Sequence, residues 1–325
     1  MNRSISASLA VLVALVLAAC GSDSESSSSK SKDSPASEPA AATQIQKDPA
    51  NASKGTITVG SKNFTEQYIL GEIYAQTLQA AGFNVKKRLN LGSEQIAFKA
   101  LKSGQIDAYP EYTGTALTSF FDVKIKDVPK DAEQAYQQAK AGFAKEDITA
   151  FPKTPFENTF RIASTVETFK KAGNPKTFSE LIAKSPNLSI SGFPECRQRT
   201  DCLLGLRDTY GYKGKFISSN GKFDDLEKGT SDLTFGFSTD AELLLTKKYV
   251  GYADDKKLFP PYNITLGMRN DAVEKIGPDG EAAILKVQKG LTEEAMRELN
   301  RRVTQEKQKP KAVAAAYLKE SGFTK

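Results

Sequence analysis

The sequence predicts an α/β protein with two lobes and a ligand cleft between them. Short apolar strands alternate with amphipathic helices from residue 56 onward, a pattern typical of parallel α/β sheets. The strands are more numerous than one sheet usually holds. Parallel sheets bind ligands beyond the carboxyl ends of their strands, and domain interfaces are preferred places for pockets. We therefore expect the ligand site between the lobes.

The first strand and helix form a β-turn-α unit. Residues 57–59 predict a strand, Gly60 begins the turn, and 65–81 predict a helix with one apolar face that ends at Gly82. The same periodicities predict the later elements. Helices are expected at 93–102, 132–143, 177–184, 240–247, 281–289, 292–305 and 310–319, and strands at 106–109, 160–164, 188–190, 233–235 and 249–250.

Composition excludes several classes of function. The chain has 325 residues, 39% of them hydrophobic and 26% charged, which is enough for two globular domains. It contains no histidine, so the usual general base, the commonest metal ligand and every Ser-His or Cys-His nucleophile pair are missing. We expect neither an enzyme nor a cofactor. The net charge of +6 is spread along the chain and does not favour nucleic acid as a partner.

The N-terminus predicts export and a lipid anchor. Residues 1–20 contain Arg3 and an apolar run at 9–17, which is too short to span a bilayer but suits a signal peptide. Residues 17–20, LAAC, resemble the lipobox of bacterial lipoproteins, in which Cys20 would be lipidated. Residues 21–54 are rich in Ser and Ala and predict a disordered stalk. We expect a lipid-anchored protein on the extracytoplasmic face of the cell membrane.

Five segments carry a family resemblance. Residues 61–72, SKNFTEQYILGE, are similar to the opening of the substrate-binding proteins of quaternary-amine ABC importers, which bind glycine betaine, choline and carnitine. Four later segments resemble family motifs in the same order: DAYPEYTGT at 107–115, FENTF at 156–160, FSTD at 237–240 and LFPPY at 258–262. The resemblance extends from about residue 56 to the end of the chain.

The resemblance implies both fold and function. Members have a two-lobed periplasmic-binding-protein fold of type II, which here places lobe 1 at 55–160 and 262–325 and lobe 2 at 161–261. They are receptors that close on a solute and deliver it to an ABC permease. For this chain the implied function is osmoprotective uptake of glycine betaine or a related quaternary amine.

Aromatic residues at family positions predict the cation site. A trimethylammonium group has no N–H to donate, so it is recognised by the negative faces of aromatic rings. The positions that match the family's aromatic cage are Tyr112, Phe160, Phe237 and Tyr262. Phe160 and Phe237 stand where the family has tyrosine.

Polar residues at family positions predict the rest of the site. Lys62 and Thr115 match positions near the ligand carboxylate, and Gln67 and Asn158 match polar positions that shape the pocket. Arg199 fits an arginine that reaches the carboxylate, with Arg197 as the alternative. Cys196 and Cys202 flank these arginines in a compartment that permits disulfides, and we expect them to pair.

Two other functions stay open at this point. The same fold could bind a different small aromatic or thiol-betaine solute, because two cage positions have lost a hydroxyl group. A surface hydrolase or adhesin is the third possibility, although the sequence contains no paired-carboxylate motif with suitable spacing.

Overall fold

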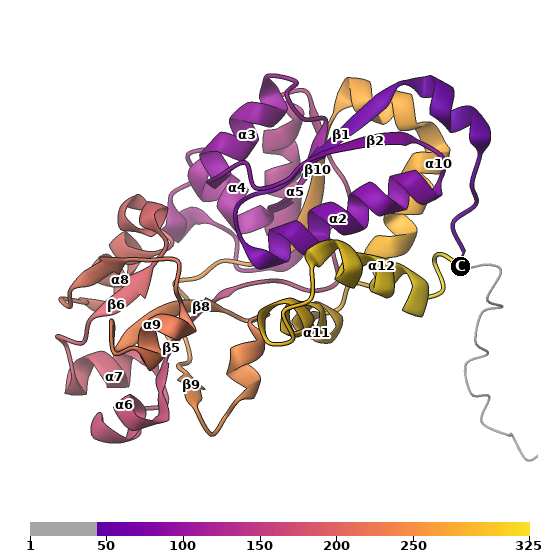
Figure 1. Ribbon diagram of the computed structural model, residues 1–325. Helices are drawn as coiled ribbons and strands as arrows, with labels where there is room; N and C mark the ends of the chain where they lie inside the picture. Colours follow the sequence, from indigo (N-terminus) through magenta and orange to yellow (C-terminus); the bar gives the residue numbers. More distant parts are fainter. Residues whose placement is uncertain (1–43) are drawn as a thin grey trace, which may run out of the picture. The chain divides into compact units, whose positions relative to one another are not determined.

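The computed structural model describes residues 44–325, which contain two five-stranded sheets (Figure 1). The first has the order β2-β1-β3-β10-β4 and the second the order β7-β6-β8-β5-β9. The first sheet consists of β1 (Thr56–Gly60), β2 (Asn84–Arg88), β3 (Ala108–Tyr112), β4 (Ile148–Ala150) and β10 (Ile264–Arg269). The second consists of β5 (Phe160–Thr165), β6 (Ile190–Gly192), β7 (Phe216–Ser218), β8 (Leu233–Phe237) and β9 (Tyr249–Gly251).

The chain crosses between the sheets twice, and the strand that follows each crossing is β5 or β10. β5 follows β4 through residues 151–159, and β10 follows β9 through residues 252–263. Both strands run antiparallel to their neighbours, whereas β1, β2 and β3 are parallel, as are β6, β7 and β8. The sheets are therefore mixed and not purely parallel as expected. β5 and β10 begin at the side where the chain crosses between the sheets, whereas β3 and β8 end at that side, so β5 and β10 run opposite to them.

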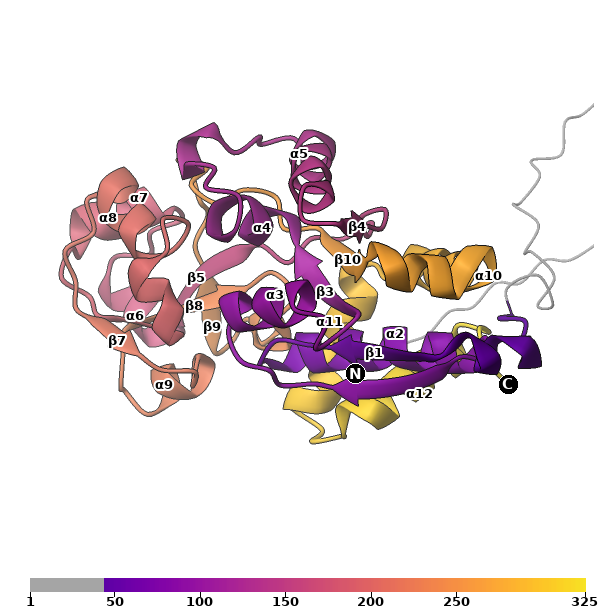
Figure 2. The ribbon, with the colours of Figure 1, turned by 90° about the horizontal axis from the view of Figure 1, so that it is seen from above.

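We call the first sheet with its helices lobe 1, and helices cover both of its faces (Figures 1 and 2). Alternate residues of β3 point to opposite faces. Tyr109 packs with α3, α4 and α5, whereas Ala108 packs in the cluster that contains α2, α10, α11 and α12. The helices are α2 (Thr65–Ala80), α3 (Glu94–Lys102), α4 (Thr113–Ser119), α5 (Ala132–Ala144), α10 (Asn270–Lys289), α11 (Glu293–Thr304) and α12 (Pro310–Glu320).

The second sheet with its helices is lobe 2. Its helices are α6 (Val166–Lys171), α7 (Phe178–Lys184), α8 (Leu203–Tyr210) and α9 (Phe223–Glu227). Short 3-10 helices are η1 (Pro49–Lys54), η2 (Ile125–Asp127), η3 (Pro194–Gln198) and η4 (Ala241–Leu244). Helix α11 of lobe 1 contacts η4 of lobe 2. The C-terminal part of the chain therefore touches both lobes.

Several predicted elements differ in extent or type. The helix expected at 65–81 is confirmed as α2. Helix α10 is longer than the expected 281–289 and contains a break at Gly277, whose φ of 57° is not helical, just before Pro278. The helix expected at 240–247 is the 3-10 helix η4, which ends at Leu244. Strands β2, β4, β7 and β10 were not predicted.

The end of the expected stalk packs on lobe 1. Ile45 donates a backbone hydrogen bond to Phe323, 2.9 Å away, and Asp48 donates one to Ala81, 3.2 Å away. Asn51 is fully buried, and its amide donates to the Ala81 carbonyl at 2.8 Å. The stalk prediction is therefore wrong for residues 44–54, where Asp48 caps a 3-10 helix with Pro49 at its start. The predicted signal peptide, Cys20 and the rest of the stalk lie outside the described residues.

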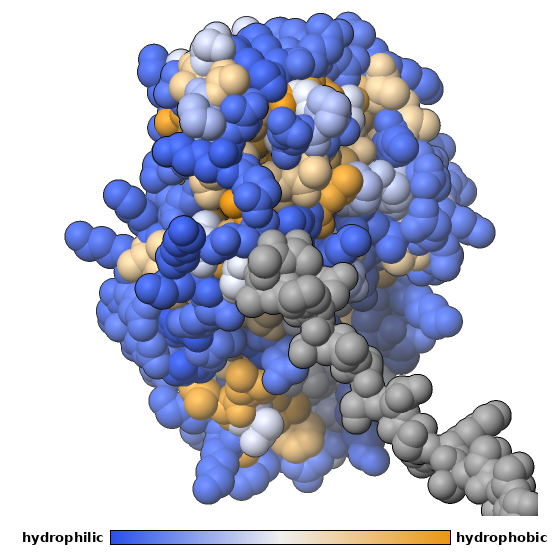
Figure 3. Space-filling model, turned by 90° about the vertical axis from the view of Figure 1, so that its right-hand side faces the viewer, coloured by the Kyte–Doolittle hydropathy of each residue, from blue (hydrophilic) through white to orange (hydrophobic). Residues whose placement is uncertain are grey.

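Figure 3 shows the side of the molecule that lies to the right in Figure 1, and most residues on this side are hydrophilic. Apolar residues gather in a few groups among them. No helix within residues 44–325 is long and apolar enough to cross a membrane.

The packing of residue 48 predicts a specific effect at Gly82. Its φ is 101°, and a Cβ there would meet the Asp48 carbonyl oxygen at 2.2 Å. Gly229 also has a positive φ, 65°, but a Cβ there would meet nothing within 4 Å. We expect Gly82→Ala to lower the free energy of unfolding in urea by about 1–3 kcal/mol more than Gly229→Ala, because only Gly82 adds overpacking. Equal losses would contradict the packing of the 44–54 segment.

Candidate ligand-binding site

A cavity of about 510 Å³ is lined by residues of both lobes. Lobe 1 contributes the segment after β1 that begins α2, and the end of β3 with the start of α4. Lobe 2 contributes the segment around η3 and the end of β8. The cavity thus lies at the carboxyl ends of β1, β3 and β8, where α/β sheets usually bind ligands.

The four aromatic residues of the predicted cage all line this cavity. The ring centroid of Phe160 lies 5.1 Å from that of Phe237 and 5.5 Å from that of Tyr262. Tyr112 joins the group through Phe64, whose centroid lies 6.0 Å from Tyr112 and 6.1 Å from Phe237. The rings form one continuous aromatic wall. Phe64 was not predicted as a site residue, although it lies within the opening motif.

Tyr262 approaches the start of α4 closely because residue 114 is glycine. A Cβ on Gly114 would meet the Tyr262 ring at 2.8 Å and the Pro261 carbonyl at 2.8 Å. The hydroxyl group of Thr113 donates to the same carbonyl at 3.1 Å. These contacts hold the segment that connects β9 to β10, residues 252–263, against the start of α4 in lobe 1.

Cations of the chain itself already face these rings. The Nζ of Lys62 lies 4.5 Å from the Tyr112 centroid, and the Nζ of Lys222 lies 4.5 Å from the Phe237 centroid. The guanidinium carbon of Arg199 lies 5.8 Å from the Phe160 centroid. These distances are typical of cation–π attraction. The aromatic wall is therefore an environment that accommodates positive charge.

Glu66 presents a buried carboxylate in the cavity wall. Its oxygens accept hydrogen bonds from the hydroxyl groups of Tyr112 (2.9 Å) and Thr239 (2.5 Å), and from the amides of Asn158 (2.8 Å) and Asn300 (3.0 Å). Burial raises the pKa of Glu66, and these hydrogen bonds oppose the rise. Its position in the first turn of α2 also favours the negative charge. Glu66 was not predicted as a site residue.

Lys62 is buried and ion-paired. It forms a salt bridge with Glu111, which is fully buried on β3. Burial lowers the pKa of Lys62, and the charge of Glu111 offsets part of that effect. The backbone N–H of Lys62 donates to Gln67 at 3.0 Å, and the Gln67 amide donates to Pro110 at 2.8 Å. Gln67 does not line the cavity, and its side chain connects Lys62 to β3 through these two hydrogen bonds.

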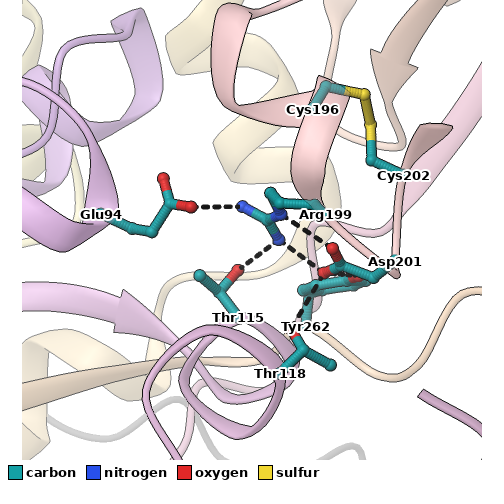
Figure 4. Close-up of a disulfide and its surroundings, with 8 residues drawn as sticks. All are labelled: Glu94, Thr115, Thr118, Cys196, Arg199, Asp201, Cys202 and Tyr262. Atoms are coloured by element: carbon teal, nitrogen blue, oxygen red, sulfur yellow. Dashed lines mark hydrogen bonds and ion pairs between the residues drawn. A yellow bond between two sulfur atoms is a disulfide. The ribbon is translucent and has the colours of Figure 1, made fainter. Parts of the chain in front are cut away.

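Arg199 lies in the cavity wall, but its guanidinium group is engaged by other side chains (Figure 4). Its Nε and Nη2 donate to the two carboxylate oxygens of Asp201 at 2.8 and 2.5 Å. The same group donates to Thr115 at 3.3 Å and to Glu94 at 3.4 Å, both in lobe 1. Arg199 therefore links the lobes. The sequence predicted that it anchors a ligand carboxylate, and these contacts compete with that role.

Asp201 accepts hydrogen bonds from residues of both lobes and of the segment between β9 and β10. Besides Arg199, it accepts hydrogen bonds from the hydroxyl groups of Tyr262 at 2.8 Å and Thr118 at 3.2 Å. Burial alone would raise the pKa of Asp201, but the charge and hydrogen bonds of Arg199 outweigh burial and hold the pKa below its ordinary value. Asp201 is therefore ionised whenever the fold is intact near neutral pH.

The loop that carries Arg199 is closed by a disulfide between Cys196 and Cys202 (Figure 4). Arg197 does not line the cavity, and its guanidinium carbon lies 5.1 Å from the Phe216 ring centroid. Of the two arginines that the sequence left open, Arg199 is the one at the cavity. The disulfide limits how far this short loop moves.

Comparison with known proteins decides the family. Residues 55–320 match the model of the substrate binding domain of ABC-type glycine betaine transport systems. The chain belongs to this family.

Relatives of this substrate-binding family agree in extent. The chain is 29% identical over 278 residues to a glycine-betaine-binding protein of Pseudomonas aeruginosa, covering 82% of this chain and 88% of that protein. It is 28% identical over 272 residues to the ergothioneine transport permease/ergothioneine binding protein EgtU of Helicobacter pylori. That match covers 82% of this chain but 48% of the relative, so the chain spans about half the length of EgtU.

A solved structure of the family supports the fold. The crystal structure of a glycine betaine/carnitine/choline ABC transporter protein superimposes with a TM-score of 0.65 at 26% identity, covering 81% of this chain and 98% of that one. The predicted two-lobed fold of type II is confirmed. As a member of this family, the chain is a solute-binding component of an ABC importer that acts outside the cytoplasm, and it is not an enzyme.

The ion pair of Arg199 with Asp201 predicts a large effect on stability. Asp201→Asn should lower the free energy of unfolding by about 3 kcal/mol or more at pH 7, because it removes one partner of a buried ion pair. The folded-state pKa of Asp201 lies below its ordinary value of about 3.9. Its contribution is thus fully present above that value and is lost as the pH falls through the folded-state pKa. Urea unfolding at several pH values should show the gap to wild type narrowing in acid.

A matched control is Asp271→Asn. Asp271 pairs with Arg269 at the same spacing and through the same two nitrogens, at 3.0 Å each, but its side chain is 49% exposed. This exposed pair should contribute less than about 1 kcal/mol. Equal losses of unfolding free energy in the two variants would contradict a stabilising buried ion pair between Arg199 and Asp201.

Proposed function

We propose that this protein is a receptor that binds a small quaternary amine against its aromatic wall and delivers it to an ABC permease for osmoprotective uptake. The observation that carries the proposal is the convergence of Tyr112, Phe160, Phe237 and Tyr262 on one cavity lined by both lobes. Water solvates a methylated cation through its charge alone, and aromatic faces replace that solvation without hydrogen bonds. The family resemblance implies glycine betaine or a related quaternary amine, and a glycine-betaine-binding protein is 29% identical to this chain.

A cavity lined by both lobes also fits the receptor role. A solute that touches both lobes favours the closed state, because it contributes binding energy only when the lobes come together. Phe237 and Arg199 belong to lobe 2, whereas Tyr112 and Lys62 belong to lobe 1. The closed receptor would then dock on the permease. Lipidation at Cys20 would keep the receptor at the membrane.

A second candidate is a larger thiol-betaine of the ergothioneine type. Phenylalanines at positions 160 and 237 make the wall less polar than the tyrosines that the family resemblance implies. The relative EgtU, named for ergothioneine, is 28% identical to this chain. A cavity of about 510 Å³ lies within the usual range for small-molecule sites. Including ergothioneine in a thermal-shift screen of the purified full-length chain separates this candidate from the smaller amines.

The positive charge of the ligand is the property to test. Isothermal titration calorimetry should show that a quaternary amine binds at least about tenfold more tightly than its neutral tert-butyl isostere, because cation–π attraction contributes about 0.5–2 kcal/mol per ring. The two molecules have nearly the same shape. Equal affinities would remove the cation–π account and with it the proposed function.

A pair of leucine substitutions tests the position of the site. Phe237 and Phe259 both pack on Phe160, at centroid distances of 5.1 and 5.2 Å, and both are half-buried, but only Phe237 lines the cavity. We expect Phe237→Leu to weaken binding of the quaternary amine by about threefold to thirtyfold through loss of one ring face. Phe259→Leu should leave affinity nearly unchanged. A larger effect at Phe259 would place the site elsewhere.

A further inference from the structure

The cavity is surrounded by more buried acid than buried base. Lys62 is the only lysine or arginine among residues 44–325 that is less than 9% exposed, and the side chain of Arg199 is 11% exposed. Four carboxylates near these two cations are each less than 9% exposed: Glu66, Glu94, Glu111 and Asp201. A fifth, Asp240, lines the cavity at 8% exposure and pairs with Lys222. Buried charges without partners are strongly unfavourable, so this surplus needs compensation.

Two cations cannot compensate four carboxylates, and the ion pairs within the chain involve three of the four. Glu111 pairs with Lys62, and Asp201 takes two donors of Arg199. Glu66 receives four neutral hydrogen-bond donors and forms no ion pair within residues 44–325. Glu94 shares Arg199 with Asp201, at the longer distance of 3.4 Å. Both Glu66 and Glu94 line the cavity. A cation in the cavity would compensate them, whereas a zwitterion would bring one negative charge for each positive one.

Glu94 lies where a ligand carboxylate would have to bind. Lys62 and Arg199 are the two cationic anchors that the sequence predicts for such a carboxylate, and the charge of Glu94 acts on both. Its Oε1 lies 3.4 Å from Arg199. A ligand carboxylate that approached these cations would meet the negative charge of Glu94 in a site with little water, where like charges repel strongly.

The charged groups at the more exposed parts of the cavity do not reverse this balance. The basic lining residues there are Lys222 and Lys307, and Lys222 pairs with Asp240 at 2.6 Å. The remaining acidic lining residues there are Glu195, Asp224 and Glu242. Over the whole lining, six acidic side chains therefore stand against four basic ones.

We infer that the preferred ligand is a quaternary amine without a carboxylate, of which choline is the simplest, and that Glu94 is the residue that disfavours carboxylate-bearing ligands such as glycine betaine. The inference rests on the proposed function, since it assumes that the cavity binds a quaternary amine. The two cations that the sequence predicts as carboxylate anchors are paired within the chain, and Glu94 beside them repels a ligand carboxylate.

The test is calorimetry on the purified full-length chain with choline, glycine betaine and the methyl ester of glycine betaine. The ester keeps the cation and removes the carboxylate charge. Choline should bind at least tenfold more tightly than glycine betaine, and the ester should bind nearly as tightly as choline. These measurements need no variant. If glycine betaine binds as tightly as choline, the inference is overturned while the proposed function stands. If no quaternary amine binds, the proposed function fails with it.

Glu94→Gln tests the assigned residue. The amide oxygen of glutamine can still accept from Arg199, but the negative charge is gone, so glycine betaine should bind at least fivefold more tightly to the variant and choline no more tightly than to wild type. Glu133→Gln is the matched control, because Glu133 also lies in the first turn of a helix, is exposed and does not line the cavity. It should change neither affinity. An unchanged affinity of Glu94→Gln for glycine betaine would overturn the role of Glu94.

Discussion

The buried carboxylate of Glu66 joins parts of the chain that are far apart in sequence. It receives hydrogen bonds from Tyr112 at the end of β3, Asn158 in the first crossing segment, Thr239 after β8 and Asn300 on α11. A buried carboxylate needs all of its hydrogen bonds, because each missing donor leaves charge that is neither solvated nor paired. The cavity wall therefore depends on one acidic group that joins both lobes, the segment 151–159 and helix α11 around the ligand site.

Local patterns in the sequence predicted the main elements and the aromatic residues. The apolar periodicity of α2 and the motifs that contain Tyr112, Phe160, Phe237 and Tyr262 are local features, and all four rings lie on one cavity. Other features depend on residues that are distant in sequence. The antiparallel direction of β5 and β10 follows from the crossing segments, and periodicity within a strand carries no information about its neighbours.

The charges around the cavity could not be predicted for the same reason. Glu94 at the start of α3 looks like an ordinary helix N-terminal acid, and nothing near it in sequence indicates its contact with Arg199, which is 105 residues away. Glu111 lies within a recognisable motif, but its salt bridge with Lys62 depends on the pairing of β1 with β3. Lys62 and Arg199 therefore looked available for a ligand, whereas the fold gives each of them a carboxylate partner.

The central claim is that a methylated cation occupies the aromatic wall. The most direct measurement is a crystal structure of the protein with choline bound. The account predicts the choline nitrogen within about 6 Å of the ring centroids of Tyr112, Phe160, Phe237 and Tyr262, with Glu94 still beside Arg199. A choline nitrogen bound outside this cavity, with the four rings packed as they are here, would contradict it.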